Sequence, residues 1–334
     1  VYTAAEAGDN RELIGKPDID KYNNYYMTQL KELLGNPDYG GKDNRFVEVW
    51  MDGAKGWGKA QDYYFTDYHK DYWVEKYGLS RDANRTRWRN VIYSPYNGHY
   101  NENMVILAPY GEMVRWIGNE NGTAGVPCWS KVNRADQRDK FLRDNGEDIH
   151  LQNHGDPEGI DWSVPETNTP IYEGGKSFYA ENEDGTPKWE PKSIRELARV
   201  YFNSVGRGTV LLLNASPGTD GKIDKAQAAR FKQFGEDIKE TFKINLAKDS
   251  TVEAGSTRGN DIAYNPQNVL DGNYDTYWTM DDGETAGILT VNFDGEKIFD
   301  IVSIQEYIPL GQRISKYNVE AYYNGDWHAF GNES

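Results

Sequence analysis

The stretch Phe46-Val47-Glu48-Val49-Trp50-Met51-Asp52-Gly53 is a short β-prone run that ends in a carboxylate. Two further apolar runs, residues 104–108 and 113–117, are also predicted to be strands, and Glu120 follows the second of them. Strands of this kind alternate with amphipathic helical segments, which predicts a parallel sheet and an α/β layer or barrel architecture. In a parallel barrel the catalytic face lies at the C-terminal ends of the strands, which is where Asp52 and Glu120 are placed.

The helical segments recur along most of the chain. An apolar stripe predicts a helix over residues 22–34, and Ser193 with Glu196 forms a capping box that opens a second helix, ending at Gly206. Residues 209–214 are predicted to be a fully buried strand, and a stripe from Phe231 to Phe242 marks a last long helix.

The pattern changes near residue 247. From there on the chain has only short strand-like pieces, residues 288–293, 301–306 and 317–322, separated by Gly, Asn and Asp turns, which is typical of an all-β sandwich. We therefore predict two domains, 1–246 and 247–334.

Composition excludes several classes of protein. The 334 residues include 37 Lys and Arg against 53 Asp and Glu, a formal net charge of −16 that would repel a nucleic acid. The longest apolar runs fall far short of the roughly 20 residues of a membrane span, so none is expected. A single cysteine, Cys128, gives neither a disulfide framework nor a cysteine-based zinc site.

The acids that follow the strands suggest hydrolysis of a sugar linkage. Glycosidic bonds are cleaved by two carboxyl groups, and aromatic rings are good platforms for the apolar face of a sugar. Trp50, Trp116 and Trp129 lie near Asp52 and Glu120 in the sequence. For each acid the alternative is a turn or helix cap, and for each tryptophan it is core packing.

These segments resemble the catalytic motifs of glycoside hydrolase family 29, the retaining α-L-fucosidases. Residues 48–54 are similar to the nucleophile motif, usually Trp-Phe-Asp-Gly-Ala, with Met51 in place of the phenylalanine. Residues 114–120 and 124–130 resemble the acid/base region of the branch that acts on α-1,3/1,4-linked fucose. Later segments of the family follow in the same order at residues 162–166, 204–207, 211–214 and 234–235.

The resemblance implies a role for each site residue. Asp52 would be the nucleophile and Glu120 the general acid/base, with carboxyl groups about 5 to 5.5 Å apart, as a retaining mechanism requires. Glu166 is the alternative acid/base. The residues expected to contact the substrate are Trp50, Trp116, Trp129 and Glu166. Catalysis is expected to need no cofactor.

The resemblance also implies a TIM-like barrel of which this chain holds the C-terminal half. The His-Trp-Gly and His-His-Asp-Gly motifs of the family's first strands, which grip the fucose hydroxyls, are absent from the sequence. Half a barrel leaves open sheet edges. The N-terminal half is therefore expected from the same gene product or from another chain.

Residues 268–278 and 287–293 resemble the start of a discoidin-like domain, also called factor V/VIII C-type or carbohydrate-binding module family 32. This resemblance implies a β-sandwich jelly roll, here truncated, with a structural Ca²⁺ held by Asp271, Asn273 and Thr276. The alternative for these three residues is an ordinary Asx turn.

Together these features predict a retaining exo-glycosidase that removes α-1,3/1,4-linked L-fucose from glycans such as Lewis-type oligosaccharides. Fucosylated glycans are the expected partners, and the expected location is secreted or on the surface of a bacterium. The alternative is a carbohydrate-binding protein on a fucosidase scaffold that lacks turnover.

Overall fold

The computed structural model describes residues 48–50, 105–107, 114–132 and 149–330, together with Thr28 and Glu32. The chain divides into two compact units, one of residues 1–170 and 200–214 and the other of residues 171–199 and 215–334. The helix predicted over residues 22–34 lies outside the described residues except at Thr28 and Glu32, which are helical. The predicted domain boundary after residue 246 stays a prediction.

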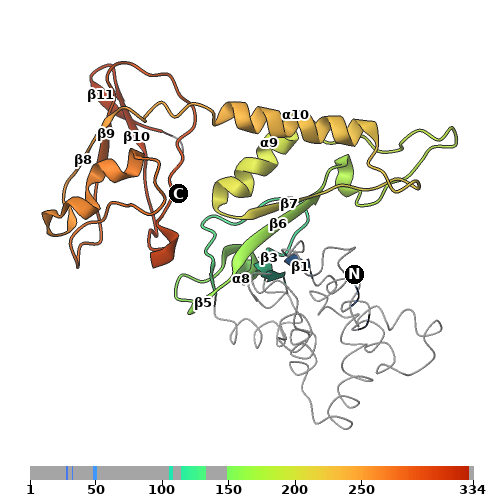
Figure 1. Cartoon of the computed structure of the whole chain (residues 1–334), viewed down its shortest axis with the longest axis horizontal. Coiled ribbons are helices and arrows are strands. Elements are labelled where there is room, and N and C mark those ends of the chain that lie inside the picture. Colours follow the sequence, from blue (N-terminus) through green and yellow to red (C-terminus); the bar gives the residue numbers. More distant parts are fainter. Residues whose placement is uncertain are drawn as a thin grey trace, which may run out of the picture. The chain divides into compact units, whose positions relative to one another are not determined.

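A parallel sheet forms the centre of the first unit (Figure 1). Its five strands follow the order β1-β2-β3-β6-β7, and every described pairing between them is parallel. The strands are β1 (Glu48–Trp50), β2 (Val105–Leu107), β3 (Val114–Trp116), β6 (Val164–Pro170) and β7 (Val210–Asn214). The predicted parallel α/β sheet is confirmed, and the strands predicted at 46–50, 104–108 and 113–117 are confirmed over residues 48–50, 105–107 and 114–116. A TIM-like barrel stays a prediction.

The sheet is curved toward one face. The indole Nε1 of Trp50 on β1 donates a hydrogen bond of 2.8 Å to Glu166 Oε1 on β6, although β2 and β3 lie between these strands. Three strand spacings would separate the two backbones by about 14 Å in a flat sheet, so the contact requires curvature. We call this side the concave face. By register and alternation it carries Glu48, Trp50, Val114, Trp116, Glu166, Asn168, Val210 and Leu212.

Strand β7 differs from its prediction. Its predicted location is confirmed, but full burial is wrong, because Val210 is 47% and Leu212 41% exposed. Both residues pair with concave-face positions of β6, and β7 is an edge strand of the described sheet. An apolar run alone does not reveal whether both sides of a strand are covered.

The opposite, outer face of β3 is held by a buried cation. Arg115 is 1% exposed, and its guanidinium donates to the backbone oxygens of Gln152 at 3.0 Å, Ser163 at 2.7 Å and Trp129 at 2.6 Å. These acceptors lie in α8 (Ile149–His154), between β5 (Asp161–Trp162) and β6, and just before β4 (Lys131–Val132). Burial lowers the pKa of Arg115 to about 10. One side chain therefore joins three separate segments to β3.

The capping box predicted to open a helix is confirmed, and that helix ends at Asn203, before the predicted Gly206. Helix α9 (Ile194–Asn203) begins at the capping box, where Ser193 N and Oγ donate to Glu196 Oε2 at 2.8 and 2.6 Å. The 3₁₀ turn η4 (Val205–Arg207) follows, and the earlier turn η3 (Glu173–Gly175) lies after β6.

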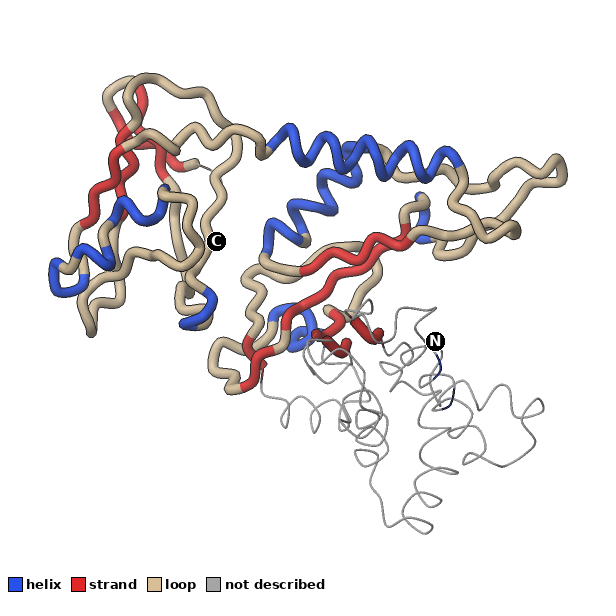
Figure 2. Tube along the Cα trace, viewed as in Figure 1, coloured by secondary structure: helices blue, strands red, loops and turns tan. Residues whose placement is uncertain are grey.

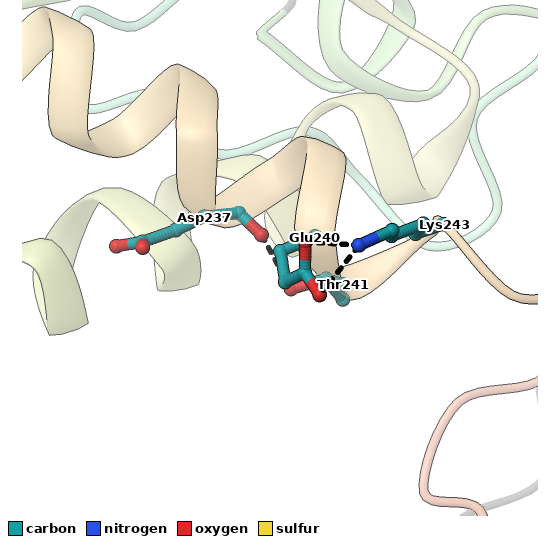
Figure 3. Close-up of polar contacts among 4 residues, drawn as sticks. All are labelled: Asp237, Glu240, Thr241 and Lys243. Carbon is teal, nitrogen blue, oxygen red and sulfur yellow. Dashed lines mark hydrogen bonds and ion pairs between the residues drawn. The ribbon is translucent and has the colours of Figure 1, made fainter.

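Helix α10 (Lys225–Thr241) is the predicted last long helix, and Asp224 caps it by accepting from Ala226 N and Gln227 N. Figure 3 shows its C-terminal end, where Lys243 Nζ donates to both carboxyl oxygens of Glu240 and Thr241 Oγ1 donates to Asp237 O. A cation at this end complements the helix dipole.

The C-terminal part of the second unit is built from antiparallel pairs (Figures 1 and 2). Strand β8 (Thr251–Ala254) pairs with β9 (Leu289–Asn292), and β10 (Glu320–Tyr323) pairs with β11 (Asp326–Ala329). Four 3₁₀ turns complete it, η5 (Arg258–Asn260), η6 (Ile262–Tyr264), η7 (Pro266–Leu270) and η8 (Ile308–Leu310). This agrees with the all-β character predicted there.

The strand predicted at residues 301–306 is wrong, because that segment forms no ladder with any described residue. The carboxylate of Glu306 instead accepts from the backbone N–H groups of Arg313 and Ile314 at 2.6 and 2.8 Å. No helix among the described residues has both the length and the apolar character needed to cross a membrane.

Gly155 gives a test of the packing around Arg115. Its φ is +68°, and an ideal Cβ there would come closer than 3.0 Å to the carbonyl oxygens of Trp129 and Lys131. Gly208 has a similar φ of +78° but nothing within 4 Å of an added Cβ. We expect Gly155→Ala to lower the free energy of unfolding by about 1–3 kcal/mol more than Gly208→Ala, measured by denaturant titration. Equal losses would show that the clash does not exist.

Candidate active site

Two tryptophans on the concave face are fixed by hydrogen bonds from their ring nitrogens. Trp50 Nε1 donates to Glu166 Oε1 at 2.8 Å, and Trp116 Nε1 donates to Asn168 Oδ1 at 2.7 Å. Trp116 and Glu166 are also paired in register across β3 and β6. The structure therefore brings together three of the predicted substrate-binding residues, Trp50, Trp116 and Glu166, and holds both indole rings in defined orientations.

A pair of carboxyl groups lies beside Trp50. Glu166 is 2% exposed and is hydrogen-bonded to Glu48, which lies on the same face of β1 two residues before Trp50. Burial, together with the charge of Glu48, raises the pKa of Glu166 to about 7, and the hydrogen bond from Trp50 partly opposes this. Burial also raises the pKa of Glu48. Below neutral pH the pair therefore keeps a proton between its two carboxyl groups.

Glu120 lies on the turn that follows β3, and its side chain is exposed. The turn is held from both sides: Asn119 Nδ2 donates to Thr123 O at 2.9 Å, and Gly122 N donates to Asn168 O at 3.1 Å. Ala124, just beyond, donates its N–H to Asn203 O at the end of α9. Glu120 is thus carried on a turn that is hydrogen-bonded to β6 next to the residue that orients Trp116.

Asp52 and Trp129 are the remaining predicted site residues. Asp52 lies outside the described residues, so its predicted separation from Glu120 stays a prediction. Trp129 is 8% exposed, and its backbone N–H donates to His154 O at 2.7 Å while its carbonyl accepts from Arg115. Trp129 is therefore buried with its backbone bonded to Arg115 and to His154, and a sugar contact by its ring also stays a prediction.

Sequence reasoning missed two members of the group, Glu48 and Asn168. Glu48 lies within the stretch 46–53, and the two-residue period of a strand places residues 48, 50 and 52 on one side. That alternation is a signal that would have included Glu48. No sequence signal indicated Asn168, because β6 itself was not predicted from its sequence Val-Pro-Glu-Thr-Asn-Thr-Pro.

The residues predicted to hold Ca²⁺ lie in the second unit and contact one another. Asp271 accepts from Asn273 N at 2.7 Å and from Thr276 Oγ1 at 2.6 Å, and Thr276 Oγ1 also reaches Asn273 O at 3.0 Å. The hydrogen bond from Thr276 lowers the pKa of Asp271. Carboxylate, carbonyl and hydroxyl oxygens are the hard donors that Ca²⁺ prefers, so the donor set fits this ion. In the described part of the chain no three His, Cys, Asp or Glu side chains gather as a metal site would need.

Comparison with known proteins identifies two regions of similarity. Residues 224–334 match the F5/8 type C domain family, as the discoidin-like resemblance predicts. Over 310 residues the chain is 31% identical to alpha-L-fucosidase 1 of Arabidopsis thaliana, an alignment that covers 92% of this chain and 53% of the plant protein. It is 30% identical to a putative alpha-L-fucosidase 1 of rice, Oryza sativa subsp. japonica, covering 93% and 52%. The chain thus spans about half the length of these curated relatives.

Solved structures give the same answer. A GH29 fucosidase of Ruminococcus gnavus in complex with fucose is 35% identical, with a TM-score of 0.73 over 96% of this chain and 59% of that one. A putative alpha-L-fucosidase of Bacteroides thetaiotaomicron is 28% identical, with a TM-score of 0.74 over 96% and 61%. The predicted resemblance to α-L-fucosidases, which are glycoside hydrolases, is confirmed. The α-1,3/1,4 preference and the individual catalytic roles stay predictions.

The raised pKa of Glu166 predicts how stability depends on pH. The folded state binds the proton more tightly than the unfolded chain, where the ordinary value is 4.5, so this stabilisation is complete below about pH 4.5 and is lost as pH rises through about 7. We expect the parent to lose more unfolding free energy between these two pH values than Glu166→Gln does, measured by urea titration. Glu183→Gln, an exposed control, should behave as the parent does. Parallel curves for the parent and Glu166→Gln would contradict the buried proton.

Proposed function

We propose that this chain forms part of a retaining α-L-fucosidase that releases α-1,3/1,4-linked L-fucose from glycans such as Lewis-type oligosaccharides. The observation that carries the proposal is the similarity to α-L-fucosidases over more than nine-tenths of the chain. The paired carboxyl groups and oriented tryptophans at the concave face support it. Because the chain spans about half of its curated relatives, the remaining barrel strands would come from a further segment or another chain.

In this proposal Asp52 attacks the anomeric carbon while Glu120 protonates the departing oxygen. Glu120 then takes a proton from water, which hydrolyses the glycosyl-enzyme ester at Asp52 with net retention. The supporting feature is the turn that carries Glu120, which is hydrogen-bonded to β6 beside Asn168. Trp50 and Trp116 would stack against the sugar, because their ring nitrogens already have acceptors and their orientations are fixed.

Glu166 is the other candidate for the acid/base. It keeps its proton to near neutral pH, as a general acid must, but it is 2% exposed and shares that proton with Glu48. Glu120 is exposed to solvent on its turn, where the acid/base of the resembling family lies. We therefore assign the acid/base role to Glu120 and leave Glu166 to the site's internal hydrogen bonding.

Variants of the three acids test these roles in the full-length protein. With a Lewis-type trisaccharide, Asp52→Ala should reduce fucose release by several orders of magnitude, because no covalent intermediate forms. With an aryl fucoside, whose leaving group needs no proton, azide should restore turnover to Glu120→Ala and not to Glu166→Ala. Glu183→Ala serves as the exposed control. Hydrolysis by Asp52→Ala at the parent rate would refute the nucleophile, and azide rescue of Glu166→Ala alone would reverse the two glutamates.

The same experiment separates the enzyme from a binding protein. A parent that binds fucosylated glycans but releases no fucose from any of them would be a carbohydrate-binding protein on a fucosidase scaffold.

We also propose that Asp271, Asn273 and Thr276 hold a structural Ca²⁺ in the F5/8 type C region. The support is the convergence of three hard oxygen donors on one turn. Added Ca²⁺ should raise the Tm of the parent and not that of Asp271→Ala, measured calorimetrically with chelator-treated protein. Asp275→Ala, on the same turn but outside the donor set, is the matched control and should respond to Ca²⁺. An equal rise in all three proteins would place the ion elsewhere.

A further inference from the structure

Glu48 has no role in the proposed reaction, yet it occupies a critical place on the concave face. It is hydrogen-bonded to Glu166, which in turn accepts from Trp50 Nε1 at 2.8 Å. Glu48 and Trp50 come from β1, and Glu166 comes from β6, three positions along in the sheet. Among the described side chains, this trio is what connects β1 directly to β6 across the two strands between them.

The connection depends on a proton. Two ionised carboxylates this close together would repel one another, since Glu166 is buried and Glu48 is partly buried, whereas one shared proton makes the contact attractive. Glu48 Oε1 is buried and has no hydrogen-bond partner among the described residues, which adds to the cost of ionising Glu48 without a proton on its neighbour.

No other charge on the described concave face competes with this pair. The facing positions of β2, β3 and β7 are Val105, Leu107, Val114, Trp116, Val210 and Leu212, none of them charged. Arg115 lies on the outer face of β3, and Glu120 lies on the turn beyond it. Asp52 follows Trp50 by two residues, outside the described segment.

We propose that Glu48 is a positioning residue: the proton it shares with Glu166 ties the end of β1 to β6, and thereby fixes Trp50 and the strand end that leads to Asp52. Loss of that proton makes the two carboxylates repel one another, leaves the hydrogen bond from Trp50 Nε1 to Glu166 to work against that repulsion, and lets the strand end shift away from the sugar. This inference rests on the proposed fucosidase function, because it assigns activity at alkaline pH to the state of this pair.

Substitution by glutamine tests whether the contact between Glu48 and Glu166 positions β1 or supplies a proton to the reaction. In Glu48→Gln the amide donates to the Glu166 carboxylate without any shared proton, and in Glu166→Gln the amide donates to Glu48 while its oxygen accepts from Trp50. Either variant should keep the strands joined at pH values where the parent's pair is doubly ionised. Glu48→Ala removes the contact between the two carboxyl groups at every pH and leaves the hydrogen bond from Trp50 Nε1 in place.

The test is the pH profile of kcat/KM for an aryl fucoside, whose leaving group needs no protonation, so that its alkaline limb does not report Glu120. The parent should lose activity as pH rises through about 7, the pKa of Glu166. Glu48→Gln and Glu166→Gln should each move this limb to higher pH by about one unit or more. Glu48→Ala should be at least about tenfold less active throughout, and Glu183→Gln should match the parent.

Each other result overturns the inference. A limb that stays in place in Glu48→Gln shows that the pair does not set it, and a limb that moves to lower pH shows that activity needs a protonated Glu166 and not the hydrogen bond between the two side chains. If Glu48→Ala and Glu48→Gln behave alike, the hydrogen bond has no positioning role.

A second measurement needs no turnover. If the parent releases no fucose at any pH, the proposed function fails, and infrared spectroscopy still tests the shared proton. The parent at about pH 6 should show the carbonyl band of a buried protonated carboxyl group, which the double variant Glu48→Gln/Glu166→Gln should lack. Absence of the band from the parent overturns the proposal.

Discussion

The described sheet depends on the hydrogen bonds that the guanidinium of Arg115 donates. Among the described residues this guanidinium has no carboxylate partner and is satisfied instead by three backbone carbonyls, from α8, from the segment before β4 and from the link between β5 and β6. Each unpaired buried carbonyl would cost about 1–3 kcal/mol, so these segments cannot move independently without leaving an acceptor or the charge itself unsatisfied. The turn that carries Glu120 follows the strand that contains Arg115. The strand that carries Glu166 begins directly after Ser163, one of the three acceptors.

The two faces of the sheet provide hydrogen-bond partners for their polar groups by different means. On the outer face backbone oxygens solvate a charge, and the thiol of Cys128, which donates to Asn153 O at 3.2 Å, completes that environment. On the concave face polar side chains satisfy one another, as Trp50 does with Glu166 and Trp116 with Asn168. A polar network in a low-dielectric setting is rigid when it is fully paired. Rigid aromatic rings are what recognition of a sugar requires.

Sequence patterning predicted β1, β2 and β3 because each is a compact apolar run, and it predicted α9 from its capping box. It failed at β6, where two prolines and four polar residues obscure the strand pattern. Pro165 lies before the pairing with β7 begins, and Thr167 is buried because its hydroxyl donates to Val210 O at 2.9 Å. The acids and tryptophans of the site were found by motif, but no local signal predicts that Arg115 is buried or that Glu48 contacts Glu166. Both depend on which strands become neighbours.

Strand β3 has only three residues, and their side chains lie on opposite faces of the sheet. Val114 and Trp116 lie on the concave face, and Arg115 lies on the outer face. A slip of one residue would move the guanidinium to the concave face and the indole to the packed outer face. Insertions and deletions should therefore be tolerated only in the connections of β3 and never within it. The register of this short strand therefore determines which face of the sheet is packed and which face carries the candidate site.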